Sequence, residues 1–291
     1  MGFRSRKRAH AGSSRHLASR DVHRDLAGTS LARRSAQLPA RALRSWLDRS
    51  HGERDAAPRR FDRRRFPRRE FGYVHVPTFS QTVPGGNATA LADSLQALIR
   101  KFDANDPCGW IVDLRRNLGG NMWPMLAGVG PILGNDETVG HFVDADSNIT
   151  TWFYSNGASG TRVPSGGRNV SAQISRTPYV LRRANSPVAV LTDSLTASSG
   201  EAITVAFRGL PRARSFGNAT AGVPTANAGF PLSDGATLFL MTALDSDRLG
   251  RWYSDRIQPD EKIFLATYPA TDDAIVVAAK NWLNTQSGCA P

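Results

Sequence analysis

The stretch VAVLTDSLTASSGEAITVAF, residues 188–207, decides the fold prediction. Its first five residues predict a short buried strand, the small residues after them predict a sharp turn, and the apolar residues from Ala202 on predict a helix. Such a turn presents Ser198 at a helix N-terminus, where backbone N–H groups and the helix dipole stabilise negative charge. The same residues also form a good helix N-cap with Glu201 in the first turn, so local pattern leaves capping and catalysis both open.

A second strand-turn-helix unit precedes the first one in the chain. The sequence WIVDLRRNLGGNMWP, residues 110–124, runs from an apolar strand through a glycine turn into a helix. Gly119 and Gly120 would let backbone amides approach a ligand closely, as an oxyanion hole requires, although a plain turn also uses a glycine pair. We expect the two turns to lie on one side of a common sheet.

The order of predicted strands and helices indicates one α/β domain over residues 71–291. A β-hairpin is predicted to extend from this domain near residues 136–165. SNGASG, residues 155–160, is predicted to be a turn. Helices are predicted from the apolar spacing at 88–102, capped by Asn87, and at 272–284. Further strands are predicted for FGYVHVPTF (71–79), ETVGHFVDAD (137–146), NITTWFYS (148–155) and ATLFLMTAL (236–244).

The net positive charge of the chain comes from residues 1–70, which hold 20 lysines and arginines against 7 acidic residues. This segment has little hydrophobic periodicity, so we expect a disordered, poorly folded or non-native leader. The alternative is a basic arm that binds nucleic acid phosphates in an accessory role. No apolar h-region follows the N-terminus and no run of about 18 apolar residues occurs, so neither a signal peptide nor a membrane span is predicted.

Cysteine and metal chemistry receive little support. Cys108 and Cys289 are too few for a disulfide scaffold and lack metal-binding spacing. One disulfide that ties the C-terminal tail to the strand entrance and two free, half-buried thiols both remain open. No metal or cofactor is expected.

A serine nucleophile needs a base, which is usually histidine. Residues 71–291 contain two histidines, His75 and His141. His75 lies in an apolar strand with Pro77 close behind, a position that suits either a base or a satisfied core histidine. His141 is interpreted as a residue on a β-sheet surface.

Three segments, GYVHVP, IVDLRRNLGG and TASSGEA, in this order and spacing, resemble the tail-specific (C-terminal processing) serine peptidase family. The similarity continues through GNATAGVPTANAGFPLSDGATLFLMTALDSDRLG and IQPDEKI, so it covers residues 71–291. The resemblance implies a crotonase/ClpP-like superhelical α/β peptidase domain that hydrolyses peptide or protein substrates. The family's usual PDZ domain is not recognisable in residues 1–70.

The resemblance also implies roles for individual residues. In this family the nucleophile stands three residues before the acidic residue of the helix, which is Ser198 before Glu201 here. Ser199 then contributes its N–H to the oxyanion hole, together with an amide of Gly119 or Gly120. Bacterial members use a lysine about 25 residues beyond the serine. That position is Val223 in this chain.

Since no lysine occurs between Lys101 and Lys262, a Ser–Lys dyad is excluded. His75 instead matches the strand histidine of the tricorn-like and nisin resistance protein-like branch. The orienting glutamate of tricorn-like members falls on Tyr253, which is not a carboxylate. The site is therefore either a Ser–His dyad or one that recruits an aspartate, for which Asp245, Asp247 and Asp255 are candidates expected in solvated loops.

Two alternatives and a question of location remain. A catalytically inactive peptide-binding domain of the same fold is the main alternative, and no G-x-S-x-G motif supports an α/β-hydrolase esterase. The family implies a periplasmic or secreted protein, whereas the absence of a recognisable signal peptide leaves the cytoplasm open. The sequence makes no prediction of oligomeric state.

Overall fold

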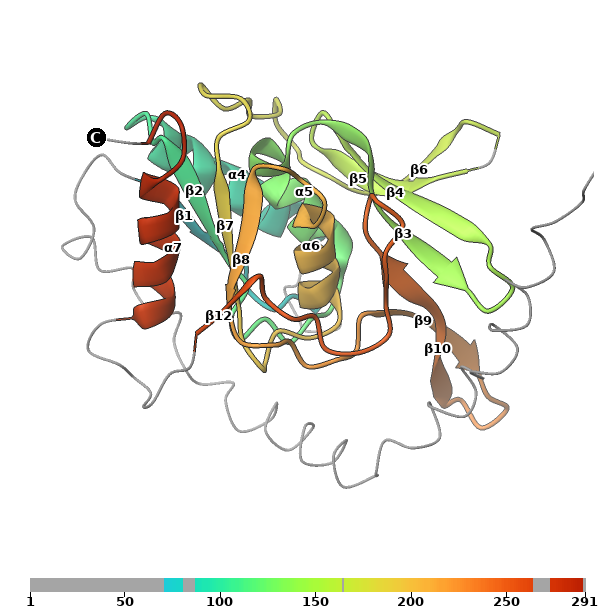
Figure 1. The fold of residues 1–291 in the computed structure, drawn as a ribbon. Coiled ribbons are helices and arrows are strands. Elements are labelled where there is room, and N and C mark those ends of the chain that lie inside the picture. The colour runs from blue at the N-terminus through green and yellow to red at the C-terminus, as the bar shows by residue number, and fades with distance from the viewer. Residues whose placement is uncertain (1–70, 81–86, 164, 264–272, 290–291) are drawn as a thin grey trace, which may run out of the picture. The chain divides into compact units, whose positions relative to one another are not determined.

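A five-stranded parallel sheet forms the centre of the fold, in the order β1-β2-β7-β8-β12 (Figure 1). Every residue of its two central apolar strands, β2 and β7, is buried, as expected for parallel strands that are covered on both faces. The strands are β1 (Phe71–His75), β2 (Gly109–Asp113), β7 (Val188–Thr192), β8 (Ala213–Gly217) and β12 (Glu261–Lys262). The computed structural model describes residues 71–80, 87–163, 165–263 and 273–289, so the expectations for the leader lie outside the described residues.

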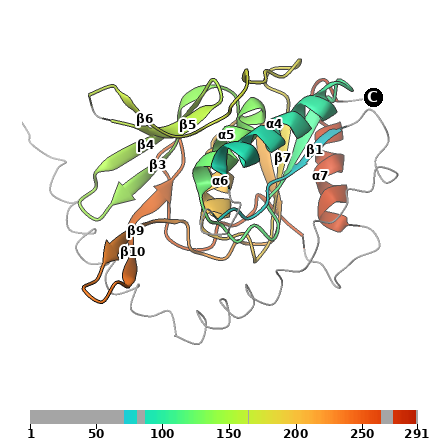
Figure 2. The same ribbon diagram turned by 180° about the vertical axis from the view of Figure 1, so that it is seen from behind.

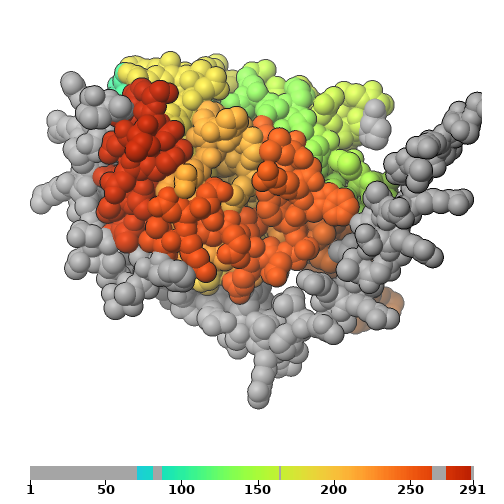
Figure 3. Space-filling model, viewed as in Figure 1, coloured from blue at the N-terminus to red at the C-terminus, as the bar shows by residue number. Residues whose placement is uncertain are grey.

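Helices cover both faces of this sheet. One hydrophobic cluster joins β1, β2 and β7 to α4 (Ala88–Asp103), α5 (Met122–Leu133) and α6 (Ser199–Phe207). A second cluster, on the opposite face, is formed by β2, β7 and β8 with α7 (Ala274–Asn284). In Figure 2, which views the molecule from behind, α4 lies in front of the sheet. In Figure 3, α7 forms part of the molecular surface. The α/β fold class is thereby confirmed.

A second, antiparallel sheet packs over α5 and α6, so that these helices are enclosed between two sheets. Its strand order is β11-β10-β3-β4-β5-β6, and β9 pairs with β10 as a projecting ribbon. The strands are β3 (Asp136–Asp144), β4 (Ile149–Ser155), β5 (Ala158–Arg162), β6 (Arg168–Gln173), β9 (Thr225–Pro231), β10 (Thr237–Ser246) and β11 (Trp252–Tyr253).

This sheet corrects the sequence prediction of a hairpin excursion near 136–165. The predicted turn at 155–160 is also wrong in length, because the chain turns at Asn156 and Gly157 and then forms β5. Neither β5 nor β6 was predicted, since ASGTR and RNVSAQ lack an apolar alternation and β6 is mostly exposed. Predicted helices α4 and α7 are confirmed, and the side chain of Asn87 caps α4 through the N–H of Ala90.

Cys108 and Cys289 form a disulfide, so of the two alternatives the bridge is confirmed. It joins the residue before β2 to the tail that follows α7. In the part of the chain that the structure describes, no helix is both long and apolar enough to cross a membrane. The same described residues contain no group of three or more histidine, cysteine, aspartate or glutamate side chains that could hold a metal ion.

Candidate active site

Ser198 occupies the N-cap position of α6, directly after the turn that follows β7. Its backbone has φ +50°, in the left-handed region that non-glycine residues adopt only when surrounding contacts impose it. The N–H of Ser199 has no acceptor among the described residues, whereas the Ser199 hydroxyl donates to the Gly120 carbonyl at 2.6 Å. Of the two adjacent serines, Ser199 therefore uses its hydroxyl in a structural contact.

The glycine turn after β2 lies against this serine. A Cβ atom built on Gly119 would approach the Cβ of Ser198 to 2.8 Å, so only glycine fits there. The Gly119 N–H donates to the side-chain oxygen of Asn117 at 2.9 Å. The Gly120 N–H, in contrast, has no acceptor among the described residues. The two unpaired amides beside Ser198 are thus those of Ser199 and Gly120.

Asn117 connects three segments of the site and is completely buried. Its side-chain amide donates to the Val76 carbonyl at 3.0 Å, one residue beyond His75. Its backbone carbonyl accepts from Ala197 at 2.9 Å, one residue before Ser198. Sequence reasoning missed this residue. A short polar side chain between a buried strand and a glycine pair, where backbone groups need partners, was the available signal.

Glu201 binds the loop that faces the nucleophile turn. Its buried carboxylate accepts from Ser198 N (2.8 Å), Thr220 Oγ1 (2.5 Å), Gly222 N (2.9 Å) and Val223 N (3.0 Å). Burial raises the pKa of Glu201, and these four donors oppose that shift. The position that carries lysine in bacterial members is therefore next to the nucleophile turn, with Val223 in its place.

His75 ends β1 at the same carboxyl edge of the sheet from which Ser198 follows β7. Since β2 separates the two strands, their ends are about 10 Å apart. Strand alternation turns His75 toward the α7 side with Tyr73, whereas Val74 packs in the cluster that contains α6. No hydrogen bond within the described residues joins the imidazole to Ser198. The structure brings Gly119, Gly120 and Ser199 to Ser198 but leaves His75 apart from it.

The register partner of His75 is Asp113, a buried carboxylate that sequence reasoning did not single out. Asp113 accepts from the Tyr73 hydroxyl at 2.5 Å and from Arg115 at 2.6 Å and 2.9 Å, and Arg115 also contacts Asp273 at 2.7 Å. Burial acts to raise the pKa of Asp113, but the Arg115 charge and its hydrogen bonds outweigh burial and hold the pKa below its usual value. These bonds occupy the carboxylate and anchor β1, β2 and the start of α7 to one another.

The family model for peptidase family S41 matches residues 70–263, a range that contains His75, the glycine turn, Ser198 and Glu201. The chain belongs to peptidase family S41. The tail-specific peptidase resemblance read from the motifs is thereby confirmed.

Two relatives of the S41 chain illustrate its place in the family. The nisin-resistance protein of Lactococcus lactis subsp. lactis is 33% identical over 212 residues, which cover 72% of this chain and 59% of that protein. A lipoprotein structure from Streptococcus agalactiae matches with TM-score 0.55 and 29% identity, covering 74% of this chain and 66% of the other. The S41 chain thus spans less than two thirds of the length of each of these relatives.

A more distant structure supports the fold alone. The photosystem II D1 C-terminal processing protease matches with TM-score 0.50 and 19% identity, over 75% of this chain and 47% of that one. The crotonase/ClpP-like α/β peptidase fold predicted from the sequence agrees with these S41 neighbours.

The candidate orienting residues of this S41 chain do not gather around His75. The Tyr253 hydroxyl donates to Asp247 at 2.8 Å, and Asp247 also accepts the N–H groups of Leu249 and Arg251. Asp247 and Asp245 are both 1% exposed, so the expectation that they are solvated loop residues is wrong. Asp245 belongs to β10 and Asp247 follows its last residue, and both are buried, which no local pattern reveals. Asp255 is exposed, as predicted.

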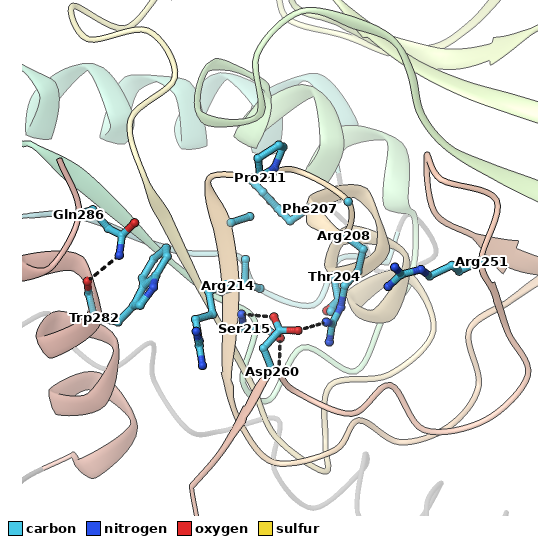
Figure 4. Close-up of a pocket in the computed structure, with 13 residues that line it drawn as sticks. Thr204, Phe207, Arg208, Pro211, Arg214, Ser215, Arg251, Asp260, Trp282 and Gln286 are labelled. Carbon is cyan, nitrogen blue, oxygen red and sulfur yellow. Dashed lines mark hydrogen bonds and ion pairs between the residues drawn. The ribbon is translucent and has the colours of Figure 1, made fainter. Parts of the chain in front are cut away.

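An open hollow in the described S41 domain lies beside Thr204, Phe207 and Arg208, at the C-terminal end of α6 (Figure 4). Its volume is about 420 Å³, and Arg208, Arg214 and Asp260 are among its lining residues. Asp260 accepts from Arg208 at 2.6 Å and from the Ser215 N–H and hydroxyl at 2.7 and 2.8 Å. Neither Ser198 nor His75 lines it, so this hollow is separate from the candidate active site.

Proposed function

We propose that this chain is a serine-type peptidase that cleaves peptide bonds through an acyl-enzyme, with Ser198 as the nucleophile. The single observation that supports this most strongly is the turn geometry. Ser198 has a left-handed backbone at the start of α6, with two unpaired amides, of Ser199 and Gly120, beside it. Donors fixed before the reaction are what stabilise a developing oxyanion.

The oxyanion hole that we infer uses Gly120 rather than Gly119. The Gly119 N–H is engaged by Asn117, so it has no proton to offer a substrate. The Gly120 N–H and the Ser199 N–H are the remaining pair, and the Phe79 N–H holds the peptide that carries the Gly120 N–H by donating to the Gly119 carbonyl at 3.1 Å. Each such donor contributes about 10²–10³ to turnover in serine peptidases.

His75 is the base that we assign. In the described residues the other histidine is His141, which lies in β3 of the second sheet and contacts Thr151 at 3.1 Å. In the proposed reaction His75 takes the Ser198 proton as Oγ attacks the carbonyl carbon. It then gives that proton to the leaving amine as the C–N bond breaks. Water, deprotonated by His75, then cleaves the ester and regenerates the serine.

The proposed reaction requires a closed state, since His75 and Ser198 lie at one sheet edge without contact. Catalytic hydrogen bonds are often long or absent in a free enzyme and form with substrate. Because Asp113 is occupied by Tyr73 and Arg115, we assign no orienting carboxylate and infer a Ser–His dyad.

Location and substrate are inferred together. The Cys108–Cys289 bridge supports an oxidising compartment outside the cytoplasm, where disulfides persist. One relative is named a lipoprotein and another a nisin-resistance protein, which agrees with that location and makes nisin the first peptide to test.

The test is labelling by a fluorophosphonate probe, which reacts with activated serines. We expect one label per chain in the wild type, none in Ser198→Ala and a much reduced rate in His75→Ala. Ser194→Ala is the matched control, because it removes an exposed hydroxyl from the same turn and should keep labelling. A folded wild-type protein that takes no label would instead support the inactive peptide-binding domain.

A further inference from the structure

Asp245 is buried without a hydrogen-bond partner. Its side chain is 1% exposed, and both carboxylate oxygens lack a partner among the described residues. Asp247, two residues on, is equally buried but accepts three hydrogen bonds. An ionised carboxylate without donors costs several kcal/mol to bury, so such a group takes up a proton instead.

A short series of backbone contacts connects Asp245 to the nucleophile. The Asp245 N–H donates to the Pro224 carbonyl at 2.9 Å. Val223, the residue before Pro224, donates its N–H to a Glu201 carboxylate oxygen at 3.0 Å. The same oxygen accepts the Ser198 N–H at 2.8 Å. The loop around Val223 is therefore held between the strand of Asp245 and the carboxylate that fixes the Ser198 peptide.

Among the charged groups near Asp245, Glu201 is the one that acts electrostatically on its carboxyl group. On β3, His141 interacts with Asp247, and on β11 the Tyr253 hydroxyl is bonded to Asp247. The cations Arg208 and Arg251 act on Tyr253 rather than on Asp245. The strand β9 carries no charged residue. Burial first, and then the charge of Glu201, raise the pKa of Asp245 well above its ordinary value.

We propose that Asp245 is a positioning residue for Ser198. In this role the Asp245 side chain is a neutral carboxylic acid beside the anionic carboxylate of Glu201. Its ionisation places a second negative charge next to Glu201 and weakens the contacts through which Glu201 fixes the loop and the Ser198 peptide. This inference rests on the proposed role of Ser198. It makes the nucleophile turn competent at neutral pH and impaired in alkali.

Stability supplies a test that does not depend on activity. An acid whose pKa is raised on folding stabilises the protein fully below the pKa of the unfolded chain, and that stability is lost as the pH rises toward the folded value. Asp245→Asn removes the titrating group and keeps the side-chain size. We expect a melting temperature above that of the wild type at pH 8 and a difference that shrinks toward pH 4.

Asp247→Asn is the matched control, because Asp247 lies two residues on, just after β10, and is equally buried but fully hydrogen-bonded. We expect this variant to melt below the wild type at pH 8, because an amide replaces a satisfied carboxylate. Melting curves of the wild type and Asp245→Asn that stay parallel from pH 4 to pH 9 would overturn the proposal, whether or not the protein labels with fluorophosphonate.

Fluorophosphonate labelling rates across pH supply the second readout. Beyond the alkaline midpoint of the wild type, we expect the Asp245→Asn rate to exceed the wild-type rate by about tenfold for each pH unit. A folded Asp245→Asn protein that is inactive at every pH would mean that a carboxylate is needed there, which contradicts the neutral-acid role. Absence of labelling in all variants would refute the proposed function, while the melting curves would still decide the protonation of Asp245.

Discussion

Gly119 lies so close to Ser198 that a Cβ atom on the glycine would be 2.8 Å from the Cβ of the serine and 2.9 Å from the Ala197 carbonyl oxygen. Gly119 also has φ +98°, a conformation that strains any L side chain. We expect Gly119→Ala to lower fluorophosphonate labelling at least as much as the loss of one oxyanion donor, about 10²-fold.

Gly134→Ala is the control for that variant. Gly134 has a similar φ of +88°, but a Cβ there would meet only Arg212 Nη2, at an ordinary contact distance of 3.8 Å. Both variants should lose about 1–3 kcal/mol of stability through backbone strain. Equal labelling by the two proteins would show that the contact between Gly119 and Ser198 has no influence on the nucleophile.

Asn117→Ala removes the side chain that joins the segment after the base strand to the glycine turn, and it keeps the backbone contact with the serine turn. The buried Gly119 N–H and Val76 carbonyl would each lose a partner, at a cost of about 1–3 kcal/mol per group. With its N–H released, the Gly119 peptide can rotate and disturb Gly120. We therefore expect a labelling rate that falls by more than the stability loss explains, measured at a temperature where the variant is fully folded. An unchanged rate in a less stable protein would limit Asn117 to a structural role.

Arg115→Ala should leave the buried Asp113 carboxylate without its cation. Removal of one partner of a buried pair costs about 3–5 kcal/mol, which urea unfolding at pH 7 would measure. Arg183→Ala, which breaks the exposed ion pair with Asp106, should change the urea midpoint far less than Arg115→Ala, because solvent screens exposed charges.

The same carboxylate predicts an acid dependence. Because the folded state lowers the pKa of Asp113, the stability from this group is present above the unfolded pKa and is lost as the pH falls through the folded one. Wild-type stability should therefore fall below about pH 4. In Arg115→Ala that fall should be shallower. If the free energy of unfolding falls equally steeply at acid pH in both proteins, Asp113 is not the group that causes the fall.

Reduction of the Cys108–Cys289 bridge should lower the free energy of unfolding. The bridge closes a loop with a sequence separation of 181, and native disulfides contribute about 2–5 kcal/mol. A Cys108→Ser, Cys289→Ser double variant should match the reduced wild type and should not respond to dithiothreitol. A response of the double variant to the reductant would point to an artefact of the reagent.

The sequence predicted the parts of the fold whose residues carry their own pattern. The apolar runs of β2 and β7 and the spacing of Leu95 and Ile99 on α4 identify these elements directly. The strands β5 and β6 escaped prediction because their residues are polar or exposed and pair only through backbone groups. Local patterning therefore revealed the parallel sheet and only part of the antiparallel one.

For the site, prediction worked where a motif is contiguous and failed where partners come from afar. The turn at Ser198 and the glycine pair were recognisable, and the structure places them in contact. The burial of Asp245 arises from α6 and from the neighbouring strand β3, which lie far from β10 in sequence. The gap between His75 and Ser198 is likewise set by sheet order, which single segments do not encode.

The link between Cys108 and Cys289 also constrains how the protein is made. Its first sulfur is synthesised before β2, and its second emerges only after α7, when nearly the whole domain has left the ribosome. A prematurely terminated chain therefore retains a reactive thiol at Cys108 that a full-length one does not. That thiol distinguishes unfinished copies from finished ones.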